Sequence, residues 1–446
     1  MILNAFMDTL LAQAAAAGIE TAEIYYAQGS SFSASALEGE IESYAVSDSC
    51  GLSLRGTVKG RMGYASTEAF DEDAITQLIE GVLESAALVE SDEQDEIFPG
   101  EKEYPTVETT PSDLDTVSAE TKLSAVLAME AASNQTDERV DKTETDLSTG
   151  FHRILLRNSY GLKLEDAGHY AVAAAASIVK DGDRMVDGFH LEAATRFDAL
   201  KPEEIGVKAA QSALKRLGAT SVPTGEYRVI LDQDAMRSLL STFCGIFSGE
   251  NAQQNLSLLA GKEGTAVASP VVTLMDDPLM PGGFATRPFD AEGSACRTKA
   301  VIQDGVLITL LHNRKTAKKQ GVETTGNAHR SGFSGPMRVA PSNFFFKPGT
   351  KDLPALAKDM GEGLVITDLS GLHAGANPAT GDFSLSAKGF KVEGGEITTP
   401  VEQITVAGNF YQLLQNIVAV GSDLRFPGSG IGAPSVDVGT MSVSGT

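Results

Sequence analysis

Apolar residues at helical spacing alternate with runs of strand character along this chain. Positions three or four apart predict a first helix that begins at Leu3 and ends at Gly18. The same spacing predicts further helices at residues 70–88, 119–132, 201–217, 235–247 and 410–420. Asp71 and Asp73 lie near the start of the second helix, where negative charge favours the helix dipole. Helices are therefore expected at both ends and in the middle of the chain.

Strand patterns fill most of the remaining sequence. Short runs are expected at residues 22–26, 41–45, 51–54 and 63–65, with glycine separating them. Residues 140–179 predict several strands, with turns at residues 158–161 and 180–183. Asp304-Gly305 and Gly394-Gly395 each separate two alternating runs, which is typical of tight hairpins. Residues 428–446 return to alternation, so the fold class is predicted as α+β with mostly antiparallel sheet.

Shifts in composition suggest three domains. Residues 1–90 form a helix–strands–helix unit, predicted as an N-terminal α/β domain. Residues 91–113 are rich in acidic side chains and proline, which predicts a solvated linker. A central domain is expected at residues 114–222. A Val-Pro-Thr-Gly boundary then leads into a large β-rich C-terminal domain at residues 223–446.

Charge and cysteine content exclude several classes of protein. The 446 residues include 35 Lys and Arg against 60 Asp and Glu, a formal charge of −25. Such a balance disfavours nucleic acid and anionic membrane as partners. No apolar run reaches the roughly 18 residues that a membrane helix needs. Three cysteines without a C-x-x-C pair, and no basic N-terminal signal segment, predict a cytoplasmic protein.

Candidate catalytic chemistry is sparse. None of the six histidines lies in an H-E-x-x-H or H-E-x-x-x-H pattern. His329, next to Arg330 in a Gly/Ser-rich loop, is a candidate substrate contact or a plain loop residue. His373 lies in a second glycine-rich loop, as a ligand contact or as a bracing hydrogen-bond partner. His152 and His190 are interpreted as strand residues with solvated rings.

Carboxylate pairs and cysteines offer weaker signals. Asp276 with Asp277, and Asp290 with Glu292, could do acid–base work or hold a hard cation. With 60 acidic residues, however, pairs at short spacing arise by chance. Cys244 lies in an apolar helical segment and is interpreted as an inert buried thiol. The residues alone therefore indicate no catalytic set.

Several strings nevertheless resemble one known family. They are GANPATGDFS at 375–384, ITVAGNF at 404–410 and TGNAHR at 325–330, with weaker matches GLSLR at 51–55 and NSYG at 158–161. These strings are similar, in the same order, to those of the TldD/PmbA family. The resemblance implies a zinc-dependent peptidase system of the bacterial and archaeal cytoplasm that matures or clears small peptides. Older names call its members modulators of DNA gyrase.

The family has two types, and the sequence favours one of them. The TldD type carries H-E-x-x-x-H on a helix early in the third domain, whereas the PmbA or TldE type lacks it and pairs with TldD. In this chain Ser241, Thr242 and Ile246 occupy the motif positions, and no histidine lies between His190 and His312. The resemblance thus predicts a TldE-like chain with no metal and no catalytic residues of its own. Zinc is expected in the partner.

The resemblance also suggests partners. We expect a TldD-type subunit and a peptide substrate, held in part by strand addition to a sheet edge. Five residues are predicted to face the substrate or the partner: His329, Arg330, His373, Asn377 and Asp382. One alternative is a free-standing homodimeric protein that binds peptides or another small ligand. Another is an independent hydrolase that uses Asp276 and Asp277, or a metal at His329 and His373.

Overall fold

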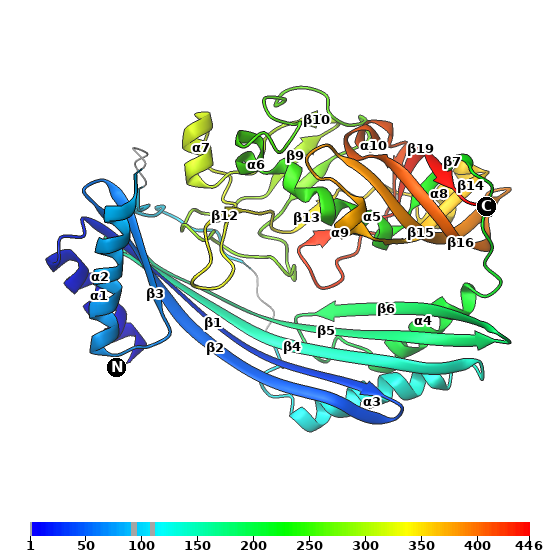
Figure 1. Cartoon of the computed structure of the whole chain (residues 1–446), viewed down its shortest axis with the longest axis horizontal. Helices are drawn as coiled ribbons and strands as arrows, with labels where there is room; N and C mark the ends of the chain where they lie inside the picture. The colour runs from blue at the N-terminus through cyan, green and yellow to red at the C-terminus, as the bar shows by residue number, and fades with distance from the viewer. Residues whose placement is uncertain (1, 91–95, 108–111) are drawn as a thin grey trace.

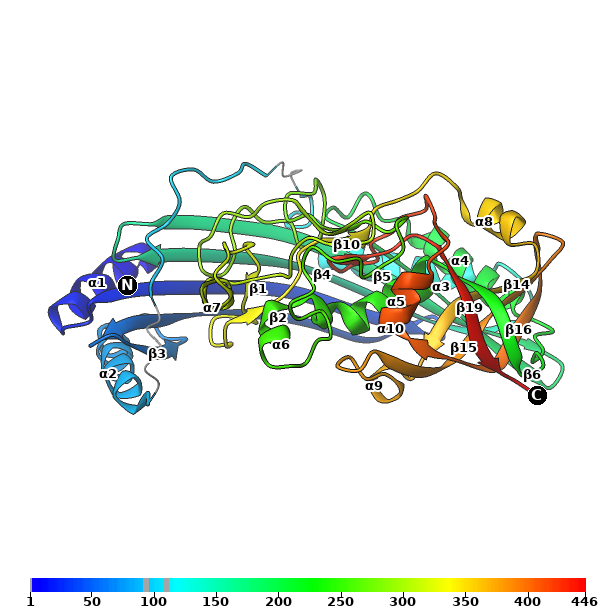
Figure 2. The same ribbon diagram turned by 90° about the horizontal axis from the view of Figure 1, so that it is seen from above.

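A computed structural model describes residues 2–90, 96–107 and 112–446. A long curved sheet forms one layer, and the C-terminal domain lies against one face of it (Figure 1). The sheet is antiparallel, in the order β3-β2-β1-β4-β5-β6. Its strands are β1 (Thr21–Leu37), β2 (Glu40–Val58), β3 (Arg61–Thr67), β4 (Val140–Asn158), β5 (Lys163–Asp181) and β6 (Arg184–Ala194). Seen from above, β1, β2, β4 and β5 run along most of the molecule (Figure 2).

Four helices cover the outer face of this sheet, the face turned away from the C-terminal domain. They are α1 (Leu3–Ala16), α2 (Glu72–Leu88), α3 (Ala119–Asn134) and α4 (Pro202–Lys215). Leu52 and Leu54 on β2 pack with α1 and α2 in one buried cluster. Ala171 and Ala173 on β5 belong to a second cluster, with apolar residues of α3 and α4. Alternate residues of each strand therefore face helices, as a two-layer sheet requires.

Strand pairing joins the predicted N-terminal and central segments. β1 pairs with β2 on one side and with β4 on the other, from Glu23 opposite Asn158 to Ala36 opposite Thr145. The sequence pattern did not predict this shared sheet. It also predicted short runs split by glycine, whereas β1 has 17 residues and β2 has 19. That prediction was wrong because Gly51 lies inside β2, where a Cβ atom would be 2.5 Å from the Phe333 ring. Glycine here permits a close approach and does not end the strand.

The C-terminal domain is built on a closed ring of strands. β7 (Gly225–Leu231), β14 (Gly363–Ser370), β15 (Asp382–Glu393), β16 (Glu396–Asn409) and β19 (Val436–Ser444) pair in turn, and β16 also pairs with β19. Only β7 and β14 are parallel within this ring. The ring closes where residues 405–407 of β16 pair with β19, and its apolar residues join α5 (Gln233–Phe243) in the largest core cluster.

A second sheet and several short elements complete this domain. The sheet has the order β10-β9-β8-β13-β18. Its strands are β8 (Leu274–Asp276), β9 (Lys299–Gln303), β10 (Val306–Leu307), β13 (Phe344–Phe346) and β18 (Ile431–Gly432). The short elements are β11 (Ala328–His329), β12 (Arg338–Val339), β17 (Ala419–Val420), α6 (Gly249–Gln253), α7 (Arg314–Gln320), α8 (Leu353–Met360), α9 (Leu372–Gly375) and α10 (Phe410–Asn416). The α+β class with mostly antiparallel sheets is confirmed.

Local predictions in the C-terminal domain were largely accurate. Both predicted hairpins form, between β9 and β10 and between β15 and β16. The helix predicted at 410–420 ends at Asn416 because Ile417 turns to an extended backbone (ψ 124°) and β17 then pairs with β19. The helix predicted at 235–247 ends at Phe243, and a 3-10 turn follows at Cys244–Phe247.

The predicted solvated linker packs against the rest of the protein over part of its length. Residues 91–95 and 108–111 of that segment lie outside the described residues. Ile97 and Phe98 are only 3% and 8% exposed, and the guanidinium of Arg314 lies 3.8 Å from the centroid of the Phe98 ring. The Tyr104 hydroxyl donates to the Gly293 carbonyl at 2.8 Å. The prediction was wrong here because apolar side chains between the acidic residues pack beneath the C-terminal domain.

Across the described helices, none is both long enough and apolar enough to cross a bilayer.

Candidate functional site

A cavity of about 500 Å³ separates the inner face of the long sheet from the C-terminal domain. β4 and β5 supply one wall, with His152, Asp166 and Tyr170. Two glycine-rich loops of the C-terminal domain, at residues 282–284 and 428–430, supply the opposite wall. Cavities between two structural units are common binding places, because both units contribute polar groups. This cavity is the principal candidate site.

Glycines on the sheet position two of the rings that line this cavity, those of His152 and Tyr170. Gly168 lies opposite His152 in the register, and a Cβ atom there would be 2.6 Å from the imidazole Cε1. Gly150 lies opposite Tyr170, and its Cβ would be 2.5 Å from that ring. Each ring therefore lies across the neighbouring strand, in space that only glycine leaves open. The sheet here presents flat rings with polar atoms to the cavity.

Burial perturbs the pKa values of two titratable groups in this wall. Burial lowers the pKa of His152, and the nearby Asp166 carboxylate only partly opposes that shift. Burial raises the pKa of Asp166, against the opposing effects of His152 and the Arg287 guanidinium. Both shifts favour the neutral forms. A neutral imidazole can donate one hydrogen bond and accept another, which suits contact with peptide groups.

Arg330 lies in the interface between the C-terminal domain and the long sheet. Its side chain is 3% exposed; its Nη1 donates to Ser53 Oγ at 3.0 Å, and the guanidinium lies 5.1 Å from the Tyr25 ring centroid. Its Nη2 is 4.0 Å from Glu23, which also pairs with Arg55. Neighbouring His329 is an exposed residue of β11, and partial burial of its ring and the charge of Arg287 lower its pKa.

The other three predicted site residues lie at the loop between α9 and β15. His373 is exposed in α9. The Asn377 side-chain oxygen accepts from the backbone N–H of Ala379 at 3.1 Å. The backbone N–H of Asn377 donates to the backbone carbonyl of Asp382 at 2.8 Å. Asn409 donates to the Asp382 carboxylate at 2.8 Å and, with Thr380, lowers its pKa. Asn377 and Asp382 are thus brought together, in a group separate from His329 and Arg330. That any of the five faces a substrate stays a prediction.

The segment to which the family resemblance assigns a TldD-type zinc site, residues 241–246, has no suitable donors. Ser241 is exposed, and the Thr242 hydroxyl donates to the Ser238 carbonyl of the same helix at 2.9 Å. Ile246 is 1% exposed, within the core. Burial raises the pKa of the adjacent Cys244 thiol to about 11, which disfavours the thiolate that binds metals. These residues do not fit a zinc site, because they offer no imidazole, thiolate or carboxylate.

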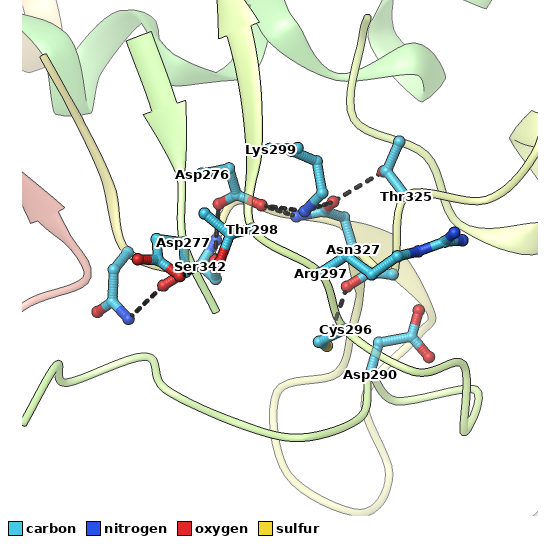
Figure 3. A network of polar contacts seen from close by, with 12 residues as sticks. Asp276, Asp277, Asp290, Cys296, Arg297, Thr298, Lys299, Thr325, Asn327 and Ser342 are labelled. Carbon is cyan, nitrogen blue, oxygen red and sulfur yellow. Dashed lines mark hydrogen bonds and ion pairs between the residues drawn. The ribbon is translucent and has the colours of Figure 1, made fainter. Parts of the chain in front are cut away.

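Internal donors engage the carboxylates of Asp276 and Asp277 (Figure 3). The Asp276 carboxylate accepts from Lys299 at 2.7 Å, from Asn327 at 2.8 Å and from the Ser342 backbone at 2.6 Å. Burial alone would raise the pKa of Asp276, but these partners outweigh it and the pKa is lowered. Asp277 accepts from the Leu279 N–H and the Thr298 hydroxyl. Both side chains brace strand ends and have no geometry for a catalytic dyad.

Asp290 and Glu292 form a second, deeply buried pair. Asp290 accepts from three backbone N–H groups, those of Glu292, Ser294 and Ala328, at 2.9 to 3.0 Å. Burial nevertheless raises its pKa. Burial and repulsion from Asp290 raise the pKa of Glu292 to about 7. In the portion of the chain that the structure describes, no three His, Cys, Asp or Glu side chains form a group that could hold a metal ion.

Sequence reasoning missed the cavity itself. It interpreted His152 as a solvated strand residue, with no role in a binding site. The available signal was the pair of glycines in otherwise regular strand patterns, Gly150 and Gly168. Their significance depends on which residues lie opposite, and that register is not visible in one sequence.

Comparisons with known proteins match the whole chain. Sequence models of the PmbA/TldA metallopeptidase match as domain 1 at residues 22–86, as the central domain at 112–217 and as the C-terminal domain at 224–445. The metalloprotease PmbA of Escherichia coli O157:H7 is 27% identical over 449 residues, covering 100% of this chain and 96% of that protein.

Solved structures give the same result. A Thermotoga maritima protein named as a modulator of a DNA gyrase is 34% identical, with a TM-score of 0.92 over 99% of this chain and 100% of that one. TldE from Thermococcus kodakarensis shares the fold, with a TM-score of 0.89 at 23% identity over 99% of this chain and 100% of its own. From domain order, sequence identity and fold together, this chain belongs to the TldD/PmbA family.

Proposed function

We propose that this chain is a TldE-like, non-catalytic subunit of a heteromeric metallopeptidase that acts on peptides. The observation that carries the proposal is the chemistry of residues 241–246, where hydroxyls and a buried isoleucine occupy the positions of the zinc ligands and the general base. The metal and the base would belong to a TldD-type partner. A cytoplasmic location is part of the same proposal, and the three unpaired cysteines favour it.

The long sheet gives this subunit a means of holding an extended peptide. β3 pairs only with residues 52–58 of β2. Residues 40–51 of β2 therefore have a strand on one side only among the described residues. Backbone N–H and C=O groups along such an edge bind a further strand without requiring a particular sequence. The cavity on the inner face would accept side chains or a chain end of the same peptide.

Reconstitution with a TldD-type homologue tests the proposal. Both chains are produced separately and together, and cleavage of a fluorogenic peptide is measured alongside mass by light scattering. We expect a mixed complex and cleavage that requires both chains. A partner variant with its H-E-x-x-x-H glutamate changed to glutamine is the matched control and should form the complex without cleaving. Unchanged cleavage in the absence of this chain, with no complex formed, would contradict the proposal.

A free-standing binding protein is the second candidate, because the cavity lies within a single chain. Light scattering of the purified chain alone separates the two. A stable homodimer that binds peptide and ignores the TldD-type homologue would favour this candidate. Stoichiometric zinc in the chain purified alone would instead favour an independent hydrolase.

A further inference from the structure

The long sheet has an incomplete edge beside the cavity. Among the described residues, β6 pairs with β5 only beyond residue 170, so residues 163–170 of β5 have a strand on one side alone, which is β4. After β6 the chain leaves the sheet, and the Ser112 hydroxyl donates to the Thr195 carbonyl at 2.9 Å. Residues 163–170 therefore form an open edge, which we call the β5 edge.

Half of the backbone groups along the β5 edge point away from β4. The Leu162 carbonyl, just before β5, accepts from the Asn158 N–H of β4. Near the other end of β5, the Lys180 N–H donates to the Arg139 carbonyl, just before β4. The one irregularity of this pairing is an extra residue on β4, so β5 itself is continuous between these two bonds. Because bonding direction alternates along an antiparallel strand, the odd-numbered residues from 163 to 169 direct their N–H and C=O groups to the open side.

These outward groups are almost without partners in the part of the chain that the structure describes. No backbone hydrogen bond engages the N–H or C=O group of Lys163, Glu165 or His169 on the open side. The Ala167 N–H interacts with the carboxylate of its neighbour Asp166. Neither a proline nor a bulge interrupts the strand here, although such features commonly protect an exposed edge. The β5 edge is therefore able to accept a further strand.

The cavity follows the β5 edge. Residues 166–170 all line it. Ala171 packs toward α3 and α4 on the outer face, so by alternation the side chains of Ala167 and His169 point to that face as well. Because both residues nevertheless line the cavity, it reaches from the inner face to the margin of the strand. Thr195, directly after β6, also lines it, so the cavity lies where β6 would continue.

We infer that an extended peptide adds to the β5 edge as a strand in line with β6, and that it lies in the cavity over its length. Outward N–H and C=O groups at every second residue pair with the backbone of another strand and require no particular sequence. Five residues of strand span about 16 Å at roughly 3.3 Å each, which a short peptide matches. A volume of about 500 Å³ accommodates such a segment rather than the edge of a second folded chain.

The walls of the cavity fit a peptide of varied sequence. Alternate side chains of the added strand would face the glycine-rich loops at residues 282–284 and 428–430, where the glycines leave room for side chains of different sizes. A peptide carbonyl would replace the Asp166 carboxylate at the Ala167 N–H. The inference rests on the proposed function, because it takes a peptide as the occupant. Unlike the open edge of β2, from which β1 and β4 separate it, the β5 edge borders the cavity.

Binding of labelled peptides to the purified full chain tests whether backbone groups hold the ligand. The first probe is a fluorescein-labelled hexapeptide amide of alternating threonine and alanine. The second is the same peptide N-methylated at its third and fourth residues, so that one methyl group meets β5 in either register. We expect the second probe to bind at least tenfold more weakly in fluorescence polarisation, because it lacks a central donor and cannot approach the strand.

Hydrogen–deuterium exchange with residue-level fragmentation locates the peptide on the wild-type chain. The first probe should slow exchange at the outward amides of residues 163, 165 and 169. Even-numbered amides of the same segment already bond to β4 and should change little. Residues 40–51 of β2 should also be unchanged. This measurement needs no variant.

A matched pair of variants adds a second readout. Ala167→Pro removes one outward N–H and blocks the edge, yet leaves the bonds to β4 in place, as proline at a sheet edge does. It should weaken binding of the first probe at least fivefold. Ala167→Thr keeps the N–H and should bind within about twofold of wild type. Thermal unfolding verifies that both variants are folded, and if Ala167→Pro does not fold, hydrogen exchange on the wild-type chain decides.

Equal binding of the two probes, or no binding of the first, would overturn the inference. Protection of residues 40–51 without protection at the β5 edge would do the same, because it would place the peptide on β2. These assays contain no partner and measure no cleavage. Failure at the β5 edge with partner-dependent cleavage intact would therefore remove this inference alone. Protection of the β5 edge without any partner dependence of cleavage would support the β5 edge and remove the proposed heteromeric function.

Discussion

The Asp276–Lys299 ion pair gives a sharp test of how the C-terminal domain is held together. The Lys299 Nζ atom lies 2.7 Å from Asp276 Oδ2, and the two side chains are 12% and 0% exposed. Lys299→Met removes the cation and leaves a buried carboxylate without its counter-charge. Breaking a buried pair in this way costs about 3–5 kcal/mol. Donors from Asn327 and Ser342 remain, so we expect about 3 kcal/mol, the lower end.

Urea unfolding followed by circular dichroism measures this loss, and the pH dependence adds a second readout. The pKa of Asp276 is lowered in the folded chain, so its stabilisation is present above the unfolded value of about 3.8 and is lost as pH falls through the folded value. Without Lys299, protonation relieves the unpaired charge. The deficit of Lys299→Met should therefore be smaller in mild acid than at neutral pH.

Two controls accompany this prediction. Lys262→Met removes an exposed lysine and should change stability by less than about 0.5 kcal/mol. The double variant Asp276→Asn with Lys299→Met should recover part of the loss, because no charge is then left buried. If Lys299→Met were within about 1 kcal/mol of wild type at neutral pH, the pair would not carry the buried charge that the geometry indicates.

Three further predictions concern other parts of the fold. The pKa of Glu292 is raised to about 7, so its contribution to the free energy of unfolding is present below the unfolded pKa near 4.5 and is lost as pH rises through 7. Glu292→Gln should abolish this loss of stability. Urea titrations above pH 7 should then show the variant to be more stable than wild type by about 3 kcal/mol. Gly188→Ala would place a Cβ atom 2.1 Å from the backbone of α4 and should cost about 1–3 kcal/mol by thermal unfolding, whereas Gly225→Ala, with only a 3.6 Å contact, should be nearly neutral. Asp71→Ala removes the side-chain cap of α2 and should cost about 1 kcal/mol in the same assay, and no loss would mean that the cap is unimportant.

Local chemistry explains which parts of the fold were predictable. The hairpin between β9 and β10 was predicted because Asp304 and Gly305 adopt positive φ angles of 48° and 84°, which their residue types favour. The start of α2 was predicted from short-range chemistry as well, because Asp71 and Asp73 lie at its N-terminal end, where negative charge favours the helix dipole. The length of β2 could not be predicted in this way. Gly51 lies inside the strand because the ring of Phe333, far along the chain, occupies the space that a Cβ atom would need.

The candidate site was only partly accessible from sequence for the same reason. The resemblance drew attention to Arg330, which the structure places in the interface with the long sheet. It gave no reason to choose His152. The position of His152 depends on Gly168 of the next strand, and one sequence does not show which residues of two strands lie opposite each other.

The central position of β1 in the long sheet has a consequence for biosynthesis. β1 and β2 leave the ribosome early, yet the neighbour on the other side of β1 is β4, which ends at Asn158. Until that residue has been translated, the nascent chain carries the β1–β2 hairpin, and the edge of β1 that later pairs with β4 has no partner strand. Non-local pairing of this kind folds slowly and is open to mispairing in the meantime. The N-terminal half of the protein is therefore expected to acquire its structure in one late, cooperative step rather than progressively as it is synthesised.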